Sequence, residues 1–260
     1  MKNHHKLKKT MDKALIKEPI GISIDNEIDD LWRKMEYMSV LMNGFDLNKN
    51  LSKEVIEPIL KTGFIDLSNF GNIRFGIESM LVEMLREVYV QHYGFIAINE
   101  DFIKDLSDVM GNHKVLEVGA GTGFLAKNLQ EQNVNLIAVD SSVEDMSRNN
   151  NEYGFRKSYT DVLEVDAVKY LRENVGSFET VLMVWPPYND KFAEEIFKEM
   201  RTGQRLIYIG ESSGGCTANK KFFNLLDKKA VLNKELTEKA NRNYQRFPMI
   251  KDRVFVYDIV

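Results

Sequence analysis

Residues 115–126, with the sequence VLEVGAGTGFLA, decide the fold of this chain. An apolar run containing Glu117 is followed by glycines at three alternate positions and then by the start of an amphipathic segment. Glycine lets a chain reverse sharply, lets a ligand approach the backbone and lets the next helix pack closely on the strand. The stretch therefore predicts a strand, a nucleotide-cofactor turn and a helix. The alternative is a strand-to-helix turn that binds no ligand.

The spacing of these glycines differs from the dinucleotide pattern. A dinucleotide fingerprint reads G-x-G-x-x-G, whereas this chain has G-x-G-x-G with Glu117 two residues before the first glycine. A carboxylate beside the turn repels a pyrophosphate but can hold an ammonium group, directly or through water. The positive end of the following helix can face a carboxylate. The turn thus favours a ligand that carries both an ammonium group and a carboxylate, such as a methionine moiety.

Composition limits the class of protein. The chain has 260 residues, 43% of them hydrophobic, which suffices for one α/β domain with an extension or for two small domains. A formal net charge of -4 gives no global case for nucleic-acid binding. The single cysteine, Cys216, excludes an intrachain disulfide, and no His/Cys set has the spacing of a zinc site, so we expect no metal.

No stretch of the sequence approaches the roughly 20 apolar residues of a membrane span, and the first residues lack the apolar core of a signal peptide. We therefore expect a soluble, cytoplasmic protein that makes no membrane contact.

The first part of the chain differs in composition from the rest. Residues 1–17 carry six lysines and two histidines, which indicates either a solvated basic tail or an electrostatic contact with RNA, DNA or an acidic partner. Helical spacing of apolar residues predicts helices over 27–43 and 77–92, with Ser52 capping a short helix between them. The methionines of the first helix are expected in the core. We expect residues 1–99 to form a basic arm and a helical cap.

Strands and helices alternate over residues 100–260, which we expect to form a second domain. Alternation of this kind predicts five parallel strands in a doubly wound sheet. A helix over 219–226, a strand near 244–249 and an alternating run at 253–260 predict a closing hairpin. The five parallel strands are expected at 115–119, 134–140, 161–167, 180–185 and 205–211.

The E-x-G-x-G-x-G arrangement resembles motif I of the class I S-adenosylmethionine-dependent methyltransferases, and the closing hairpin is similar to that of their seven-stranded sheet. The resemblance implies an α/β fold with a doubly wound, mainly parallel, Rossmann-like sheet and S-adenosyl-L-methionine as the cofactor. It also implies that the cofactor is bound by Glu117, Gly119, Ala120, Gly121, Thr122 and Gly123.

Two acidic residues end predicted strands, at the edge where such sheets bind ligands. Asp140, followed by Ser141, matches the family's acid that accepts hydrogen bonds from the ribose hydroxyls. Asp166 matches the acid that accepts from the adenine amino group. The alternative for both is an N-cap, in the case of Asp140 of a helix over 143–149. Phe124 is expected either to pack on the cofactor or to lie in the core.

The segment WPPYND, at 185–190, ends the fourth predicted strand. It resembles motif IV of amino-methylating enzymes, in which an acidic or amide residue accepts a hydrogen bond from the amine. Trp185 stands in that position and offers only an N–H donor, which argues against a nucleic-acid amine as the acceptor. We expect Trp185 to stack on the substrate or lie near the sulfonium, the Pro186 carbonyl to orient an acceptor and Tyr188 to line the pocket. The alternative is a rigid turn with two core aromatics.

The segment GESSGGCTA, at 210–218, follows the fifth predicted strand. Its small residues allow a close approach to a substrate, and Glu211 supplies a carboxylate at the strand end. Cys216 is expected to have a structural role, because no histidine is paired with it in the sequence. Candidate general bases are Glu211, Asp190, Tyr188 and His92.

Residues 90–260 resemble a more specific group of small methyltransferase-like proteins that share the patterns Y-x-W-A-I-P, C-W-P-P-Y-x-D-P-M-A and I-Y-x-G-E-x-x-G-G-C-T-A. In this chain Asn99 replaces the first proline, and Lys191-Phe192 replaces Pro-Met. The resemblance names no acceptor. We therefore expect a methyltransferase acting on a small molecule, peptide or protein by direct displacement. The alternatives are a nucleic-acid methyltransferase and a catalytically silent cofactor-binding regulator.

Overall fold

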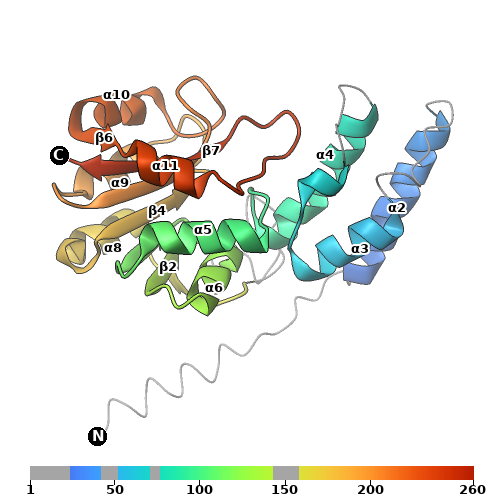
Figure 1. The fold of residues 1–260 in the computed structure, drawn as a ribbon, viewed down its shortest axis with the longest axis horizontal. Helices are drawn as coiled ribbons and strands as arrows, with labels where there is room; N and C mark the ends of the chain where they lie inside the picture. The colour runs from blue at the N-terminus through green and yellow to red at the C-terminus, as the bar shows by residue number, and fades with distance from the viewer. Residues whose placement is uncertain (1–23, 42–51, 71–76, 143–157) are drawn as a thin grey trace, which may run out of the picture.

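The computed structural model describes residues 24–41, 52–70, 77–142 and 158–260 (Figure 1). The basic arm at 1–17 and the helix expected over 143–149 lie outside the described residues. So does Met42, and the side chain of Met38 is also outside the description.

A single sheet of seven strands forms the centre of the fold, in the order β3-β2-β1-β4-β5-β7-β6. The first five strands of this order run parallel, whereas β7 is antiparallel to both of its neighbours. This confirms the expected α/β class with a doubly wound, mainly parallel sheet. The strands are β1 (Val115–Val118), β2 (Leu136–Asp140), β3 (Val162–Glu164), β4 (Thr180–Val184), β5 (Arg205–Gly210), β6 (Ala230–Leu232) and β7 (Arg253–Ile259).

The prediction of a strand near 244–249 is wrong. The penultimate strand is β6, and helix α11 (Lys234–Ala240) separates it from β7, so the two strands pair without forming a tight hairpin. The segment 244–249 contains Pro248, which has no N–H to donate to a ladder. Its aromatic residues Tyr244 and Phe247 instead pack on the core.

Strand alternation divides the apolar residues between two faces of the sheet. Leu116 and Val118 pack in one cluster with α8 (Ala167–Glu173), α9 (Phe192–Glu199) and α10 (Lys220–Lys229). Val115 packs in the other cluster, with α5 (Glu100–Met110) and α6 (Phe124–Glu131). A short helix, η2 (Val175–Ser177), precedes β4. Glu117 alternates with Leu116 and Val118, so it faces the same side of the sheet as Val115.

Three helices before α5 form the cap, which we define as α2 (Ile24–Leu41), α3 (Lys53–Thr62) and α4 (Ile77–Tyr93) with the short helix η1 (Leu67–Phe70). Figure 1 shows them grouped beside the sheet, away from the C-terminus. The expected helices are confirmed over the described residues, and Met35 of the methionine stripe is fully buried. One continuous apolar cluster joins the cap to the sheet, because it contains Leu31 and Leu85 together with Leu182 and Ile207.

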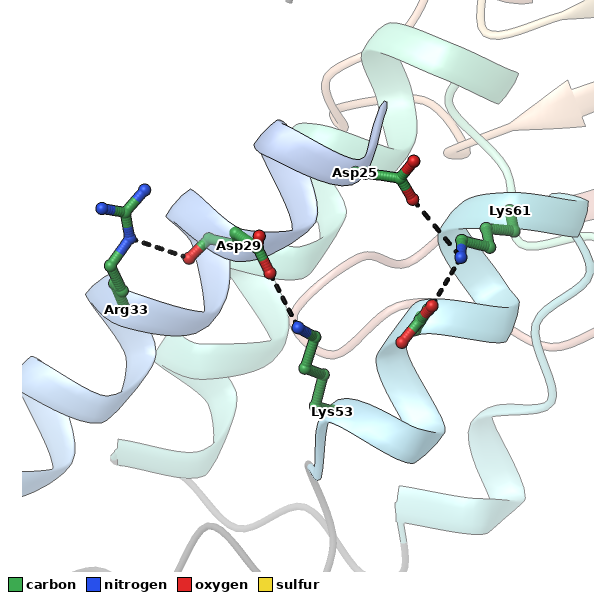
Figure 2. Close-up of polar contacts among 6 residues, drawn as sticks. Asp25, Asp29, Arg33, Lys53 and Lys61 are labelled. Atoms are coloured by element: carbon green, nitrogen blue, oxygen red, sulfur yellow. Dashed lines mark hydrogen bonds and ion pairs between the residues drawn. The ribbon is translucent and has the colours of Figure 1, made fainter. Parts of the chain in front are cut away.

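Ion pairs link α2 to α3 on the outside of the cap (Figure 2). Lys53 Nζ lies 2.7 Å from Asp29 Oδ1, and Lys61 Nζ lies 3.3 Å from Asp25 Oδ1. All four side chains are exposed, so these pairs contribute little compared with the buried apolar contacts. Ser52 is the N-cap residue of α3, as expected, but its side chain makes no capping hydrogen bond.

Asn99 joins the cap to the sheet domain. Its Oδ1 accepts a hydrogen bond from Phe102 N–H at 2.8 Å and so caps α5, while its Nδ2 donates to the Asn243 carbonyl at 3.0 Å. We expect Asn99→Ala to lower the free energy of unfolding by about 2 kcal/mol, because it removes both bonds. Asn99→Asp keeps the cap and should lose about half of that amount. Urea denaturation measures both, and equal losses in the two variants would contradict this assignment.

Candidate functional site

Three glycines in left-handed conformation connect β1 to α6. The φ angles are +69° at Gly119, +55° at Gly121 and +68° at Gly123. A Cβ on Gly123 would lie 2.8 Å from Val162 Cγ2 and 3.0 Å from Thr160 Cγ2, and a Cβ on Gly119 would meet the ring of Phe192 at 3.4 Å. Glycine is thus required at Gly123 by packing as well as by backbone conformation.

Asp140, at the end of β2, holds this turn from the side. Its Oδ2 accepts a hydrogen bond from Gly121 N–H at 2.9 Å, and its Oδ1 accepts one from Ser142 N–H at 2.9 Å. Ser141 between them is exposed. The carboxylate retains lone pairs beyond these two bonds, so it can still accept hydrogen bonds from a ligand. The structure therefore brings Asp140 and the glycine turn together, as the sequence predicts.

Glu117 is a buried carboxylate with an unused oxygen. Only 2% of the residue is exposed, and among the described residues its Oε2 has no hydrogen-bond partner. Burial, followed by the negative charge of Asp140, raises the pKa of Glu117 to about 8. A buried carboxylate is costly without a partner. A cationic ligand group placed beside Oε2 would remove this cost.

Thr122 ties the turn to the cap. Its hydroxyl donates to the Tyr93 carbonyl at 3.2 Å, and its own carbonyl accepts a hydrogen bond from Tyr159 N–H at 2.8 Å. The rings of Tyr93 and Tyr159 lie 4.8 Å and 4.9 Å from that of Phe124, between centroids. Phe124 is buried in the core. The end of α4 therefore rests directly on the glycine turn.

Asp166 lies apart from this group. Its side chain is exposed, and its Oδ1 accepts a hydrogen bond from Lys169 N–H at 2.7 Å as the N-cap of α8. Asp166 therefore acts as an N-cap, which was the alternative to a cofactor contact. Its role toward adenine stays a prediction.

Trp185 leaves β4 with a left-handed φ of +47°. Its backbone N–H donates to the Ile209 carbonyl at 2.8 Å, and its indole Nε1 donates to Asp252 Oδ2 at 2.8 Å. The indole stacks on Phe95, with centroids 5.6 Å apart and planes at 11°, and the Arg86 guanidinium lies 5.7 Å from its centroid. The ring is therefore held between the sheet and the cap, with its one donor already in use.

The rest of the WPPY turn is joined to the loop 210–218. The Pro186 carbonyl accepts a hydrogen bond from Ala218 N–H at 3.2 Å, and Asn189 N–H donates to the Ala218 carbonyl at 2.9 Å. Tyr188 is 68% exposed, so in this structure it does not share an enclosed pocket with Trp185. The two expected substrate segments thus form one hydrogen-bonded unit.

Glu211 braces two loops. Its Oε2 accepts a hydrogen bond from Cys216 N–H at 2.7 Å, and its Oε1 accepts one from Lys251 N–H at 2.8 Å. The residue is 8% exposed. Because both oxygens are engaged by backbone donors, Glu211 shapes the loop 210–218. Cys216 itself is exposed.

The other candidate bases also have local partners. His92 is buried, and its Nε2 pairs with Glu27 of α2. Asp190 Oδ1 accepts a hydrogen bond from Phe192 N–H at 2.7 Å at the start of α9. The structure does not bring His92, Asp190 and Tyr188 together with Trp185 through any described contact.

Sequence reasoning missed Asp252, Arg86 and Tyr244. Asp252 is 2% exposed and accepts the indole N–H of Trp185. Burial raises the pKa of the Asp252 carboxyl. The hydrogen bonds from Trp185 and Tyr244 and the charge of Arg86 act in the opposite direction. The one sequence feature that could have indicated Asp252 is its position just before the last predicted strand, because its partners are distant in sequence.

The described part of the chain has neither a metal-binding cluster nor a helix that could span a membrane. It contains no group of three or more His, Cys, Asp or Glu residues arranged to hold a metal ion. None of its helices has the length and apolar character to cross a membrane.

No protein-family model and no curated protein sequence matches this chain. Solved structures are similar at low identity. Magnesium protoporphyrin IX methyltransferase (ChlM) from Synechocystis PCC 6803, with bound S-adenosylmethionine, is 13% identical over 73% of this chain and 85% of its own, with a TM-score of 0.38. The N-methyltransferase NodS from Bradyrhizobium japonicum WM9, with S-adenosylhomocysteine, is 14% identical over 62% and 84%, with a TM-score of 0.38.

The PH0226 protein from Pyrococcus horikoshii OT3 is 15% identical over 61% of this chain and 89% of its own, with a TM-score of 0.40. None of these similarities assigns an activity to this chain.

The raised pKa of Glu117 predicts a pH-dependent stability. The carboxyl ionises near its ordinary value of 4.5 when unfolded but near 8 when folded, so stability falls as the pH rises through that window. We expect Glu117→Gln to be more stable than the parent protein at about pH 8, by a few kcal/mol, and to lose this advantage near about pH 5. Urea denaturation across pH measures the difference. The matched change Glu131→Gln, at an exposed glutamate, should show no such trend.

Proposed function

We propose that this chain binds S-adenosyl-L-methionine and transfers its methyl group to a small-molecule, peptide or protein acceptor. The observation that carries the proposal is the unused, buried oxygen of Glu117 beside a turn of left-handed glycines. The cofactor has the cationic ammonium group that such an oxygen needs, and its carboxylate suits the positive end of α6. A pyrophosphate would be repelled by Glu117 and by Asp140.

Each residue around the turn has a distinct part in holding this cofactor. Glu117 takes the ammonium group, and Gly119, Gly121 and Gly123 leave room for the ligand against the backbone. Asp140 accepts hydrogen bonds from the ribose hydroxyls with its remaining lone pairs. The further predicted contacts come from Ala120, Thr122, Ser141, Asp166 and Trp185.

The acceptor lies beyond the carboxyl ends of β4 and β5, on the unit formed by the WPPY turn and the loop 210–218. When bound, the cofactor supplies a methyl group already activated for displacement. The protein's contribution is therefore alignment of the acceptor and exclusion of water. Trp185 and Pro186 shape the base of the proposed acceptor site, and Glu211 fixes the loop 210–218. Tyr188 lies at the edge of the same site.

The cofactor site can be tested by binding alone. We expect Gly121→Arg and Asp140→Ala each to weaken S-adenosylmethionine binding by at least about tenfold, because one fills the turn and the other removes its brace. Isothermal titration calorimetry measures the affinity, and thermal melting checks that each variant is folded. Asp161→Ala, at an exposed aspartate just before β3, is the control and should bind normally. Normal binding by both site variants would refute the assignment.

The acceptor class requires a transfer assay. The purified protein is incubated with methyl-labelled cofactor and separate pools of metabolites, peptides, proteins, RNA and DNA. We expect label in metabolites, peptides or proteins, and loss of that label with Gly121→Arg. Label found in nucleic acid alone would overturn the proposed acceptor class. Tight cofactor binding with no transfer to any pool would instead indicate a regulatory protein.

A further inference from the structure

Two exposed basic residues at the start of β7 lie beside the loop 210–218. Arg253 pairs in the sheet with Gly210, the residue at which β5 ends and this loop begins. Lys251 N–H donates to Glu211 Oε1 at 2.8 Å, so Lys251 lies against the loop. Both basic residues are exposed. They therefore stand at the carboxyl end of β5, the edge at which doubly wound sheets bind their ligands.

A third exposed cation, Lys220, reaches the same place from α10. One turn later on this helix, the ring of Phe223 lies 6.0 Å from that of Tyr208, between centroids, and the ring of Phe255 lies 6.1 Å from it. Residues three apart on a helix share a face, as do residues two apart on a strand. Lys220 and Arg253 therefore continue this aromatic contact toward the carboxyl edge, from α10 and from β7.

The protein does not neutralise these three cations. Neither lysine nor Arg253 has an ion-pair partner among the residues that the structure describes. The carboxylates of Glu211 and Asp252, which belong to the same edge, are buried and already accept hydrogen bonds. Lys220, Lys251 and Arg253, which we call the cation group, thus form a positive surface on a chain whose formal net charge is -4.

The surface next to the cation group is open and carries apolar side chains. Tyr188, on the WPPY turn that is hydrogen-bonded to the loop 210–218, is 68% exposed. Met249, two residues before Lys251, is 60% exposed. Tyrosine, methionine and arginine are enriched where proteins bind proteins, whereas small molecules bind in concave sites that enclose them. This surface therefore suits a polypeptide better than a small molecule.

The charge of the surface selects among polypeptides. Three cations complement a short run of carboxylates, since opposite charges attract across a surface and favour encounter. A long polyphosphate would also meet the net negative charge of the whole chain, which opposes its approach. The observations thus favour an acidic peptide over a nucleic acid.

We propose that the methyl acceptor is an acidic segment of a peptide or protein, and that the cation group binds its carboxylates beside the loop 210–218. This inference rests on the proposed function and names the class of its second substrate. The segment lies along the carboxyl edge of the sheet, so that a neighbouring residue of the same polypeptide reaches over the WPPY turn. The cation group holds the segment and takes no part in the transfer itself.

A matched pair of triple variants tests the proposal. The site variant neutralises the cation group and consists of Lys220→Gln, Lys251→Gln and Arg253→Gln. The control variant removes the same charge from three exposed lysines at the other end of α10 and beyond β6, and consists of Lys228→Gln, Lys229→Gln and Lys234→Gln. Thermal melting, and S-adenosylhomocysteine affinity within about twofold of the parent, establish that both variants are folded with an intact cofactor site.

The first measurement is the fluorescence anisotropy of labelled hexaglutamate, titrated into protein saturated with S-adenosylhomocysteine. We expect hexaglutamate to bind the parent and the control variant, and to bind the site variant about tenfold more weakly, because three charge pairs are lost. Hexaglutamine should bind the parent at least about tenfold more weakly than hexaglutamate. The affinity for hexaglutamate should fall as the salt concentration rises.

The second measurement is transfer from methyl-labelled cofactor to three synthetic peptide pools. All pools have the same randomised central positions, and these are flanked by glutamates, by glutamines or by lysines. We expect at least about fivefold more label in the glutamate-flanked pool than in the glutamine-flanked pool, and least in the lysine-flanked pool. The site variant should lose this preference, whereas the control variant should keep it.

Different results separate the two proposals. If S-adenosylhomocysteine does not bind the folded parent protein, the proposed function fails. If it binds but hexaglutamate does not, or if the site and control variants weaken hexaglutamate equally, the role of the cation group is overturned. Equal labelling of the three pools overturns the acidic acceptor. Displacement of labelled hexaglutamate by citrate or by hexathymidylate at the same concentration as by unlabelled hexaglutamate overturns the choice of a peptide.

Discussion

The left-handed turn between β1 and α6 is the constraint on which the rest of the site depends. Gly119, Gly121 and Gly123 all have positive φ, and side chains from β3 and α9 pack close to the first and last of them. The turn lets Gly121 N–H donate a hydrogen bond to Asp140, and it places the start of α6 next to the end of β1. Because a Cβ at Gly123 would collide with Val162, only glycine lets α6 begin this close to β3.

The turn also explains why the cap packs where it does. Glu117 faces the side of the sheet that α5, α6 and the cap cover, and Tyr93 at the end of α4 accepts a hydrogen bond from Thr122. Burial excludes water from Glu117 Oε2, which has no hydrogen-bond partner among the described residues, and the resulting penalty appears as the raised pKa of Glu117. A cationic ligand would be bound more strongly there than at an exposed carboxylate, since the charges interact in a less polar surrounding.

Local patterns made most of the fold predictable, whereas contacts between distant segments did not. The five parallel strands and the turn follow from runs of residues that are contiguous in sequence. The strand β6, Ala230–Leu232, was missed because it follows α10 directly, with no turn residue between the two elements. The aromatic segment at 244–249 packs on the core instead. The site shows the same limit: Asp140 is found 19 residues from Gly121, but Trp185 and Asp252 are 67 residues apart. No local spacing rule connects such a pair.

Trp185 shows why a motif has to be interpreted through its partners. A donor-only side chain in the WPPY turn argues against a nucleic-acid amine as the acceptor when the segment is considered alone. In the fold, the indole N–H of Trp185 donates to the buried carboxylate of Asp252, which Tyr244 and Arg86 also face. Because the same ring stacks on Phe95, Trp185 joins the segment before β7 to the residues that follow α4, a structural role that the WPPY sequence alone does not indicate.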